Sequence, residues 1–316
     1  GSFGNAIKLI ELSNEVGASA VKFQLHIAEE ETTTDAPSPA FFSGEDRFTY
    51  FKRTSFSPDQ WAKLRSFAKQ VNIDFIVSPF SMKAVDILAR IDIDTYKIAS
   101  GEVTNIPLLE KIGKTGKKVI LSTGMSTFAE IDDAVRALNC RNNLTIMQCT
   151  SEYPCSPMNV GINVIPYLEQ RYHTKVGYSD HSDGNLAALL AVSYGAKAIE
   201  KHLTFSKKMY GSDAKYASEP IQFKELSKSL LEAELIINNK VDKDAMAKEL
   251  KSMKLVFEKS IVANSNLKKG SLIKEENIGL KKPGNGLSPS KYKQLIGKIL
   301  NKDINKDQKI FLEDVT

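Results

Sequence analysis

The sequence has 316 residues, of which 42% are hydrophobic and 26% charged, and its formal net charge is +5. These fractions are typical of a soluble globular protein, and no apolar run approaches the roughly 20 residues that span a bilayer. The charge is too mild and too dispersed for a nucleic-acid binder, but it suits a small anionic substrate. We expect no membrane span, no signal peptide and a cytoplasmic location. The three cysteines, Cys140, Cys149 and Cys155, lack metal-ligand spacing and are expected to be reduced.

Short β-branched runs alternate with amphipathic segments of helical period as far as about residue 238, which indicates a parallel α/β fold. We predict strands at residues 20–24, 75–78, 95–99, 118–122, 144–148, 175–178 and 196–201. The predicted helices begin near Asn5, Pro58, Lys83, Pro107, Ala129, Met158, Asn185 and Pro220. Seven strands with eight helices predict a (β/α)₈ TIM-type barrel whose first strand is missing from this sequence. A doubly wound open sheet is the alternative, but no G-x-G-x-x-G turn follows an early strand.

The pattern changes after the barrel. Residues 239–254 form a polar, lysine-rich linker of helical character. The tail, residues 255–316, has short β runs at 260–263 and 310–312 and turns such as Lys268-Lys269-Gly270. The predicted domains are therefore a barrel at 1–238 and a small β-rich domain at 255–316. A tail of about 60 residues has a marginal core alone, so we expect it to dock on its own barrel or on a partner subunit.

Polar and charged residues collect where five of the predicted strands end. These segments are Lys22-Phe23-Gln24, Ser78-Pro79-Phe80, Lys97-Ile98-Ala99-Ser100-Gly101-Glu102, Ser122-Thr123-Gly124 and Cys149-Thr150-Ser151-Glu152-Tyr153. A single strand-end lysine is usually solvated. Two lysines and several hydroxyls at one barrel mouth, however, favour a site for a phosphate or carboxylate.

Two of the four histidines follow the last two predicted strands. His181 ends the run Gly177-Tyr178-Ser179-Asp180-His181, and His202 ends Ala198-Ile199-Glu200-Lys201-His202. A lone histidine more often caps or packs than ligates a metal, but two at matched positions on adjacent strands predict a divalent-metal site. Such an ion keeps open positions for water and a substrate oxygen. His26 and His173 lack this placement and are interpreted as structural or surface residues.

These motifs, in this order, resemble the sialic acid synthases and the related legionaminic and pseudaminic acid synthases over nearly the whole chain. The tail resembles the SAF, or antifreeze-like, domain of the same enzymes. The further matching elements are Leu121-Ser122-Thr123-Gly124-Met125, Gly211-Ser212-Asp213, Ser260-Ile261-Val262-Ala263 and Lys282-Pro283-Gly284-Asn285-Gly286. The resemblance implies condensation of phosphoenolpyruvate with an N-acyl hexosamine, such as N-acetylmannosamine, to give a sialic-acid-type nonulosonic acid and phosphate.

The resemblance also implies roles for individual residues. His181 and His202 would hold a divalent metal, usually Mn²⁺, with Mg²⁺ or Co²⁺ as alternatives, and Glu102 would transfer a proton or stabilise the cation at C2. Phosphoenolpyruvate would be held by Lys22, Ser78, Lys97, Ser100, Ser122 and Ser179. The sugar would contact Gln24, Tyr153 and Asp213. A domain-swapped homodimer would bring Lys282 to the N-acyl group from the partner subunit.

The sequence departs from the family pattern at three places. Family members begin with a strand that ends in Glu and with an Asn-His-x-Gly-Ser motif, whereas this sequence opens Gly1-Ser2-Phe3. Lys282 stands where many members have Arg, which removes a planar fork of donors. Ser151 stands where some members have Asn. Two other functions stay open: a related metal-dependent aldolase or keto-sugar-acid synthase, and an inactive sugar-phosphate-binding relative.

Overall fold

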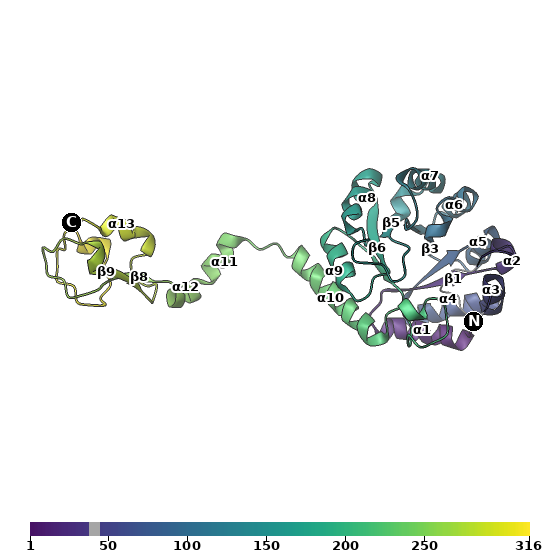
Figure 1. The fold of residues 1–316 in the computed structure, drawn as a ribbon, viewed down its shortest axis with the longest axis horizontal. Helices are drawn as coiled ribbons and strands as arrows, with labels where there is room; N and C mark the ends of the chain where they lie inside the picture. Colours follow the sequence, from purple (N-terminus) through teal and green to yellow (C-terminus); the bar gives the residue numbers. More distant parts are fainter. Residues whose placement is uncertain (38–44) are drawn as a thin grey trace. The chain divides into compact units, whose positions relative to one another are not determined.

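The computed structural model describes residues 1–37 and 45–316, and the chain forms two compact units, Gly1–Asn238 and Asn239–Thr316 (Figure 1). The resemblance to the synthases makes the segment from residue 28 to 54 a candidate for contacts with the sugar substituents, and part of this segment lies outside the described residues. No helix in the described part of the chain is long and apolar enough to cross a bilayer.

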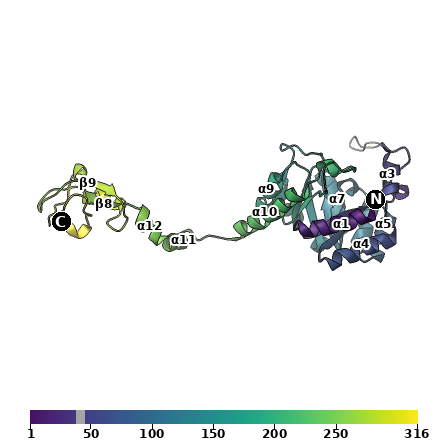
Figure 2. The same cartoon turned by 90° about the horizontal axis from the view of Figure 1, so that it is seen from below.

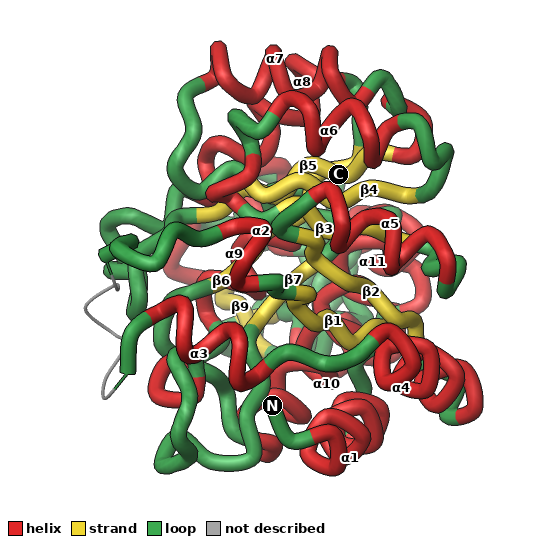
Figure 3. Tube along the Cα trace, turned by 90° about the vertical axis from the view of Figure 1, so that its right-hand side faces the viewer, coloured by secondary structure: helices red, strands yellow, loops and turns green. Residues whose placement is uncertain are grey.

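All seven predicted strands are present in the first unit, and they form one parallel sheet in chain order. Their bounds are β1 (Ala20–Leu25), β2 (Asp74–Pro79), β3 (Thr95–Ile98), β4 (Lys118–Ser122), β5 (Leu144–Cys149), β6 (Lys175–Asp180) and β7 (Ile199–Lys201). Figure 3 shows the sheet curling through the unit with helices on its outside. Because every strand runs in the same direction, the carboxyl ends of all seven open on one rim.

The chain opens on a helix, as predicted, and a helix follows each strand. The bounds are α1 (Phe3–Glu15), α4 (Pro58–Gln70), α5 (Met82–Arg90), α6 (Ile106–Gly113), α7 (Phe128–Leu138), α8 (Ile165–Tyr172), α9 (Leu186–Ser193) and α10 (Pro220–Asn238), with α2 (Ala28–Glu31) and α3 (Arg47–Thr54) between β1 and α4. Ser57 and Thr127 start α4 and α7 with capping boxes, which satisfy backbone donors that a helix start leaves free. Helix α1 lies beside α10, where Gly17 approaches Ser227 (Figure 2).

The start of α8 was predicted wrongly, near Met158, because the segment before it is tied to neighbouring strand ends instead of coiling. The Cys155 backbone N–H donates to the His181 carbonyl at 2.9 Å, and the Thr150 hydroxyl donates to the Asn159 carbonyl at 2.7 Å. Gly161 then adopts a positive φ of 64°, which a helix does not allow, so α8 begins only at Ile165.

The sheet is a curled half-barrel, since within the described residues no strand pairs with the free edges of β1 and β7. Its interior and the helix layer share one apolar cluster that includes Leu25, Tyr96, Leu121 and Tyr178, each at most 2% exposed. Burial of such side chains contributes about 1.5–3 kcal/mol each. This packing fixes the positions of the strand ends on which the site is built.

The second unit has its own small core, formed by Ile261, Ile278, Leu295 and Ile310 among others. Helices α11 (Lys243–Glu249) and α12 (Lys251–Phe257) precede the antiparallel pair β8 (Ser260–Ala263) and β9 (Ile278–Lys281), and α13 (Tyr292–Leu295) follows. The predicted strand at 310–312 is wrong. Ile310 makes one backbone bond to Ile261, and the chain then turns into a short 3₁₀ helix at Leu312–Asp314.

Candidate active site

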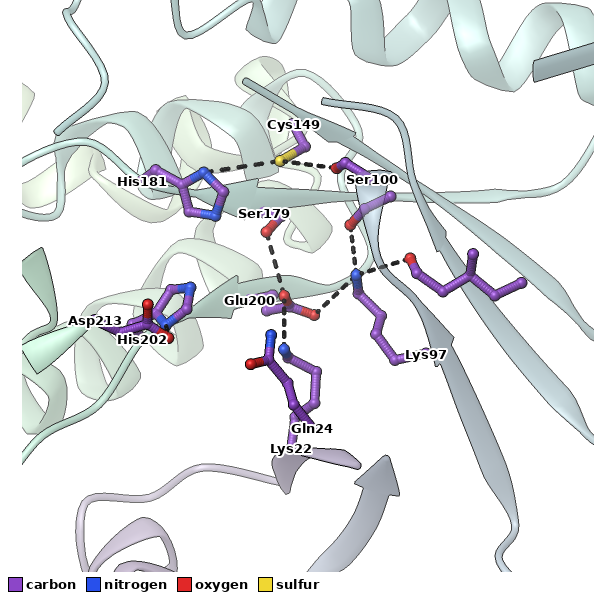
Figure 4. A network of polar contacts seen from close by, with 12 residues as sticks. Lys22, Gln24, Lys97, Ser100, Cys149, Ser179, His181, Glu200, His202 and Asp213 are labelled. Atoms are coloured by element: carbon purple, nitrogen blue, oxygen red, sulfur yellow. Dashed lines mark hydrogen bonds and ion pairs between the residues drawn. The ribbon is translucent and has the colours of Figure 1, made fainter. Parts of the chain in front are cut away.

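A carboxylate, Glu200 on β7, lies between two lysines at the rim of the half-barrel (Figure 4). Its two oxygens lie 3.5 Å from the Lys22 ammonium of β1 and 3.7 Å from the Lys97 ammonium of β3. The Lys97 side chain is 3% exposed, whereas those of Lys22 and Glu200 are 20% and 18% exposed. The curvature of the sheet thus brings residues of β1, β3 and β7 close enough to form two ion pairs. With two lysines and one glutamate, the cluster carries a net positive charge.

The charges of this cluster stabilise one another. Burial raises the pKa of Glu200, but the charges of Lys22 and Lys97 outweigh burial and bring that pKa down to about 2. Burial lowers the pKa of Lys97, and the charge of Glu200 works against that decrease. Glu200 is therefore ionised at neutral pH, and it holds both ammonium groups near one point.

Hydroxyl groups from neighbouring strands surround the lysine pair. The Lys97 ammonium donates to the Ser122 hydroxyl at 2.5 Å, and the Ser179 hydroxyl donates to Glu200 at 3.3 Å. Ser78, in register with Gln24, is 1% exposed, and its hydroxyl has no hydrogen-bond partner among the described residues. Buried hydroxyls normally have a partner, so an unsatisfied one beside a cationic cluster suits a ligand oxygen.

Three side chains converge closely on Gly124, two residues after Ser122. The Gly124 backbone N–H donates to the Ser100 hydroxyl at 3.0 Å. A β-carbon at this position would lie 2.4 Å from the Ser151 hydroxyl, 2.9 Å from that of Ser100 and 3.0 Å from the Cys149 sulfur. The glycine therefore lets three polar side chains converge where a larger residue would separate them.

Replacing Gly124 by alanine is expected to weaken anion binding while the protein stays folded. The new methyl group would meet the ends of rotatable side chains rather than backbone, so Ser100 and Ser151 can turn away at little cost to stability. Losing one or two hydrogen bonds of about 1 kcal/mol should raise the dissociation constant for an anion bound at this rim about five- to tenfold. An unchanged constant together with an unchanged melting temperature would show that Ser100 and Ser151 do not contact the ligand.

The two predicted metal-binding histidines are neighbours, with ring centroids 5.6 Å apart. Nδ1 of His181 lies 2.8 Å from the Thr150 carbonyl, and Nδ1 of His202 lies 3.3 Å from a carboxylate oxygen of Asp213. Because both partners only accept, each Nδ1 carries a proton, and in the neutral form of each ring the lone pair is therefore on Nε2. Burial lowers the pKa of His181 to about 4, so this imidazole is neutral at pH 7.

This arrangement fits a divalent ion. Metal-binding histidines commonly donate their other N–H to a carbonyl or a carboxylate, as both do here. The described residues contain no group of three or more His, Cys, Asp or Glu arranged to hold a metal. Two imidazoles would therefore leave most of the coordination sphere to water and substrate oxygens. The Tyr153 ring stacks on His181 at 4.1 Å, and its hydroxyl lies 3.1 Å from Nε2, so a metal bound at this nitrogen would replace the hydroxyl contact.

Three other predicted site residues make separate contacts. Glu102 ends the 3₁₀ turn Ser100–Glu102 and accepts from the Asn105 side chain at 2.8 Å. Burial raises its pKa, as does the charge of Glu31. Gln24 is exposed on the rim, near Lys22 in Figure 4, and its side-chain oxygen lies 3.4 Å from His26. Lys282 belongs to the second unit, where its ammonium lies 5.0 Å above the Phe257 ring.

Of the two remaining histidines, His26 is a packed residue and His173 an exposed one. His26 lies between the rings of Phe51 and Phe80, at 3.8 and 4.1 Å, and pairs with Glu31 at 2.6 Å. His173 ends α8 with a positive φ of 51°. Neither is among the labelled residues of the network in Figure 4.

Sequence reasoning gave no role to Glu200 or to Cys149, although both stand in the motifs it used. Cys149 lies 3.9 Å from both the Ser100 hydroxyl and the His181 ring. Side chains two residues apart on a strand share a face, so the placement of His202 at the mouth also places Glu200 there. That alternation is the signal that could have identified the carboxylate.

Comparison with known proteins supports this picture. Residues 9–242 match the NeuB family, and residues 258–316 match the SAF domain. The chain is 36% identical to the N,N'-diacetyllegionaminic acid synthase of Campylobacter jejuni, with 98% of this chain and 95% of that protein covered. It is 32% identical to the pseudaminic acid synthase of the same species, with 96% and 90% covered.

A solved structure shows the same fold. The N-acetylneuraminic acid synthetase of Leptospira borgpetersenii, crystallised in complex with citrate, is 28% identical and superimposes with a TM-score of 0.70. The comparison covers 80% of this chain and 86% of that one. Because the family match spans the whole half-barrel and the relatives are similar along nearly their full length, the chain belongs to the NeuB family and carries a SAF domain at its C-terminus.

Proposed function

We propose that this chain is an enzyme that condenses phosphoenolpyruvate with an N-acyl hexosamine, giving a nonulosonic acid of the sialic acid type and inorganic phosphate. The observation that carries the proposal is the juxtaposition of the Lys22–Glu200–Lys97 cluster with the imidazoles of His181 and His202 on one rim. The names of the relatives, legionaminic and pseudaminic acid synthases, agree with this class of product.

Phosphoenolpyruvate would occupy the cationic side of the rim. Lys22 and Lys97 would donate to the phosphate or carboxylate, and the hydroxyls of Ser78, Ser100, Ser122 and Ser179 lie on the strand ends around them. Charge-assisted bonds of this kind are about twice as strong as neutral ones. Glu200 fixes the position of the two ammonium groups before the ligand arrives, which reduces the reorganisation needed on binding.

The sugar would occupy the histidine side. We propose that His181 and His202 hold a divalent metal, with Mn²⁺ as the first candidate, and that Asp213 and Thr150 orient the two rings. When bound, such an ion supplies Lewis-acid polarisation of the C1 aldehyde of the open-chain sugar. Tyr153 and Gln24, next to the two subsites, would contact sugar hydroxyl or N-acyl groups.

The reaction then balances without another co-reactant. A bond forms between C3 of phosphoenolpyruvate and C1 of the sugar, and the aldehyde oxygen takes up a proton. Water adds to the cation at C2 and loses a proton, and the C2–O bond to phosphate then breaks. The positive rim would hold the phosphate through this sequence. Glu102, whose pKa is raised by burial, is proposed to move a proton near C2.

Phosphate release measured with phosphoenolpyruvate, N-acetylmannosamine and Mn²⁺ tests the proposal. We expect release only when all three are present, and a panel of N-acyl hexosamines would identify the preferred sugar. Phosphate release without a sugar acceptor, or a product without a new carbon–carbon bond by mass spectrometry, would contradict the proposed condensation.

We further propose a homodimer in which Lys282 reaches the mouth of the partner's half-barrel. Mixing two inactive variants tests this exchange. A dimer of one His202→Ala chain and one Lys282→Ala chain contains one complete site only if Lys282 acts on the other subunit. We expect activity on mixing that neither variant has alone. If the mixture stays inactive while the mixed dimer is detected by mass spectrometry, Lys282 does not act in this way.

A further inference from the structure

A buried ion pair lies directly beside both histidines in sequence, yet neither of its members belongs to the proposed substrate site. The Lys201 ammonium lies 2.6 Å from the Asp180 carboxylate, and the two side chains are 5% and 0% exposed. Asp180 is the last residue of β6 and Lys201 the last residue of β7, and the two are direct partners in the register of these strands. Each is followed by one of the histidines, His181 or His202.

The ion pair also binds Ser182, the residue that follows His181 in the sequence. The Asp180 carboxylate accepts from the Ser182 backbone N–H at 2.9 Å and from the Ser182 hydroxyl at 2.7 Å. The Lys201 ammonium donates to the Ser182 carbonyl at 2.9 Å. The ion pair therefore fixes the residues on both sides of His181 in the sequence, Asp180 and Ser182. Its own carbonyl accepts from the Cys155 backbone N–H, also at 2.9 Å.

Side-chain alternation separates this pair from the chemistry. Ser179 and Glu200 bond to each other and form part of the mouth, so the next residues, Asp180 and Lys201, point to the opposite face of the sheet. Replacing a whole buried ion pair by apolar residues of similar size is often neutral or even stabilising, whereas removing one half of the pair is costly. The position of the two histidines therefore explains this ion pair better than a contribution to the free energy of unfolding does.

We propose that Asp180 and Lys201 are positioning residues that set the separation and orientation of the His181 and His202 imidazoles. The pair fixes the ends of β6 and β7 against each other at the point where each strand gives way to its histidine. Thr150 and Asp213 then orient the rings from the mouth side. Where it concerns metal affinity, the inference rests on the proposed metal site; where it concerns ring geometry, it does not.

The chain has only four histidines, so protein labelled with [¹⁵N]histidine gives a simple spectrum of ring nitrogens. His181→Ala and His202→Ala assign two of the rings. In the native protein we expect both to show a protonated Nδ1 and an unprotonated Nε2. In Lys201→Met and Asp180→Asn, the signals of His181 and His202 should move toward mixed tautomers, while those of His26 and His173 stay in place. Lys201→Arg should restore the native pattern.

Calorimetric titration with Mn²⁺ provides the second measurement. Loss of a group that orients a metal ligand usually lowers metal affinity 10- to 100-fold, and we expect on the order of tenfold for Lys201→Met. Arg171→Met is the matched control, because it breaks the ion pair with Asp132 and can lower the melting temperature without altering the rings. If Lys201→Met does not fold, Ser182→Ala removes a single contact to Asp180 and should shift His181 alone.

The outcomes are distinct. Native protein that binds no Mn²⁺ would overturn the proposed metal site, and the ring spectra would still decide the positioning role. Variants that lose thermal stability but keep native His181 and His202 signals would overturn the positioning role and leave the proposed function intact. Equal shifts of the His181 and His202 ring signals in Arg171→Met and Lys201→Met would also overturn the positioning role.

Discussion

Replacing His181 or His202 by alanine is expected to abolish Mn²⁺-dependent turnover. Each substitution removes one of the two imidazoles whose Nε2 atoms are left with a lone pair by the Thr150 and Asp213 contacts. A single remaining protein ligand would hold the ion weakly, and Lewis-acid catalysis supplies several kcal/mol to such reactions. The rate of phosphate release should therefore fall on the order of a hundredfold or more. Titration with Mn²⁺ should show the loss of binding directly.

His173→Asn is the matched control for these two variants. His173 is exposed, and its positive φ of 51° suits asparagine better than alanine. This variant should keep full activity and full Mn²⁺ affinity. Full activity in either His181→Ala or His202→Ala, with the melting temperature unchanged, would remove the assignment of both histidines as metal ligands.

The strands and their polar ends could be predicted because both follow from local pattern. A buried parallel strand is a short apolar run bounded by turn residues, and the functional groups of a barrel stand where such runs end. Lys22, Lys97, His181 and His202 were located on this basis alone. Their mutual approach could be expected too, because the carboxyl ends of parallel strands share one rim.

Contacts across the mouth could not be predicted in the same way. Glu200 reaches Lys22 only because curvature brings the ends of β7 and β1 to opposite sides of one small space. The sequence also shows no sign that Glu102 turns toward Asn105, since one residue of 3₁₀ rotation redirects the side chain. The sequence places Asp180 and Lys201 near the ends of two strands, and only the register of β6 and β7 shows that they are direct partners.

Replacing Lys22 or Lys97 by methionine is expected to weaken phosphoenolpyruvate binding and to leave sugar binding nearly unchanged. Methionine keeps much of the apolar stem but deletes a charge-assisted contact of about 1.5–3 kcal/mol, so the Michaelis constant for phosphoenolpyruvate should rise on the order of tenfold or more. The Michaelis constant for the sugar should move far less, because the histidine side of the rim is not touched. Steady-state kinetics with each substrate varied in turn measures both constants.

Because Glu200 contacts both lysines, we expect the effects of Lys22→Met and Lys97→Met on binding to be coupled. The double variant measures the size of this coupling. If each ammonium grips the ligand independently, the free-energy losses of Lys22→Met and Lys97→Met should add in the double variant. Because both ammonium groups lie within 3.7 Å of the same carboxylate, we expect a clear departure from additivity. Lys117→Met is the control, since that lysine pairs with Asp92 and is absent from the labelled network. If both rim variants bind phosphoenolpyruvate normally, the anion site lies elsewhere and the role given to this cluster must be withdrawn.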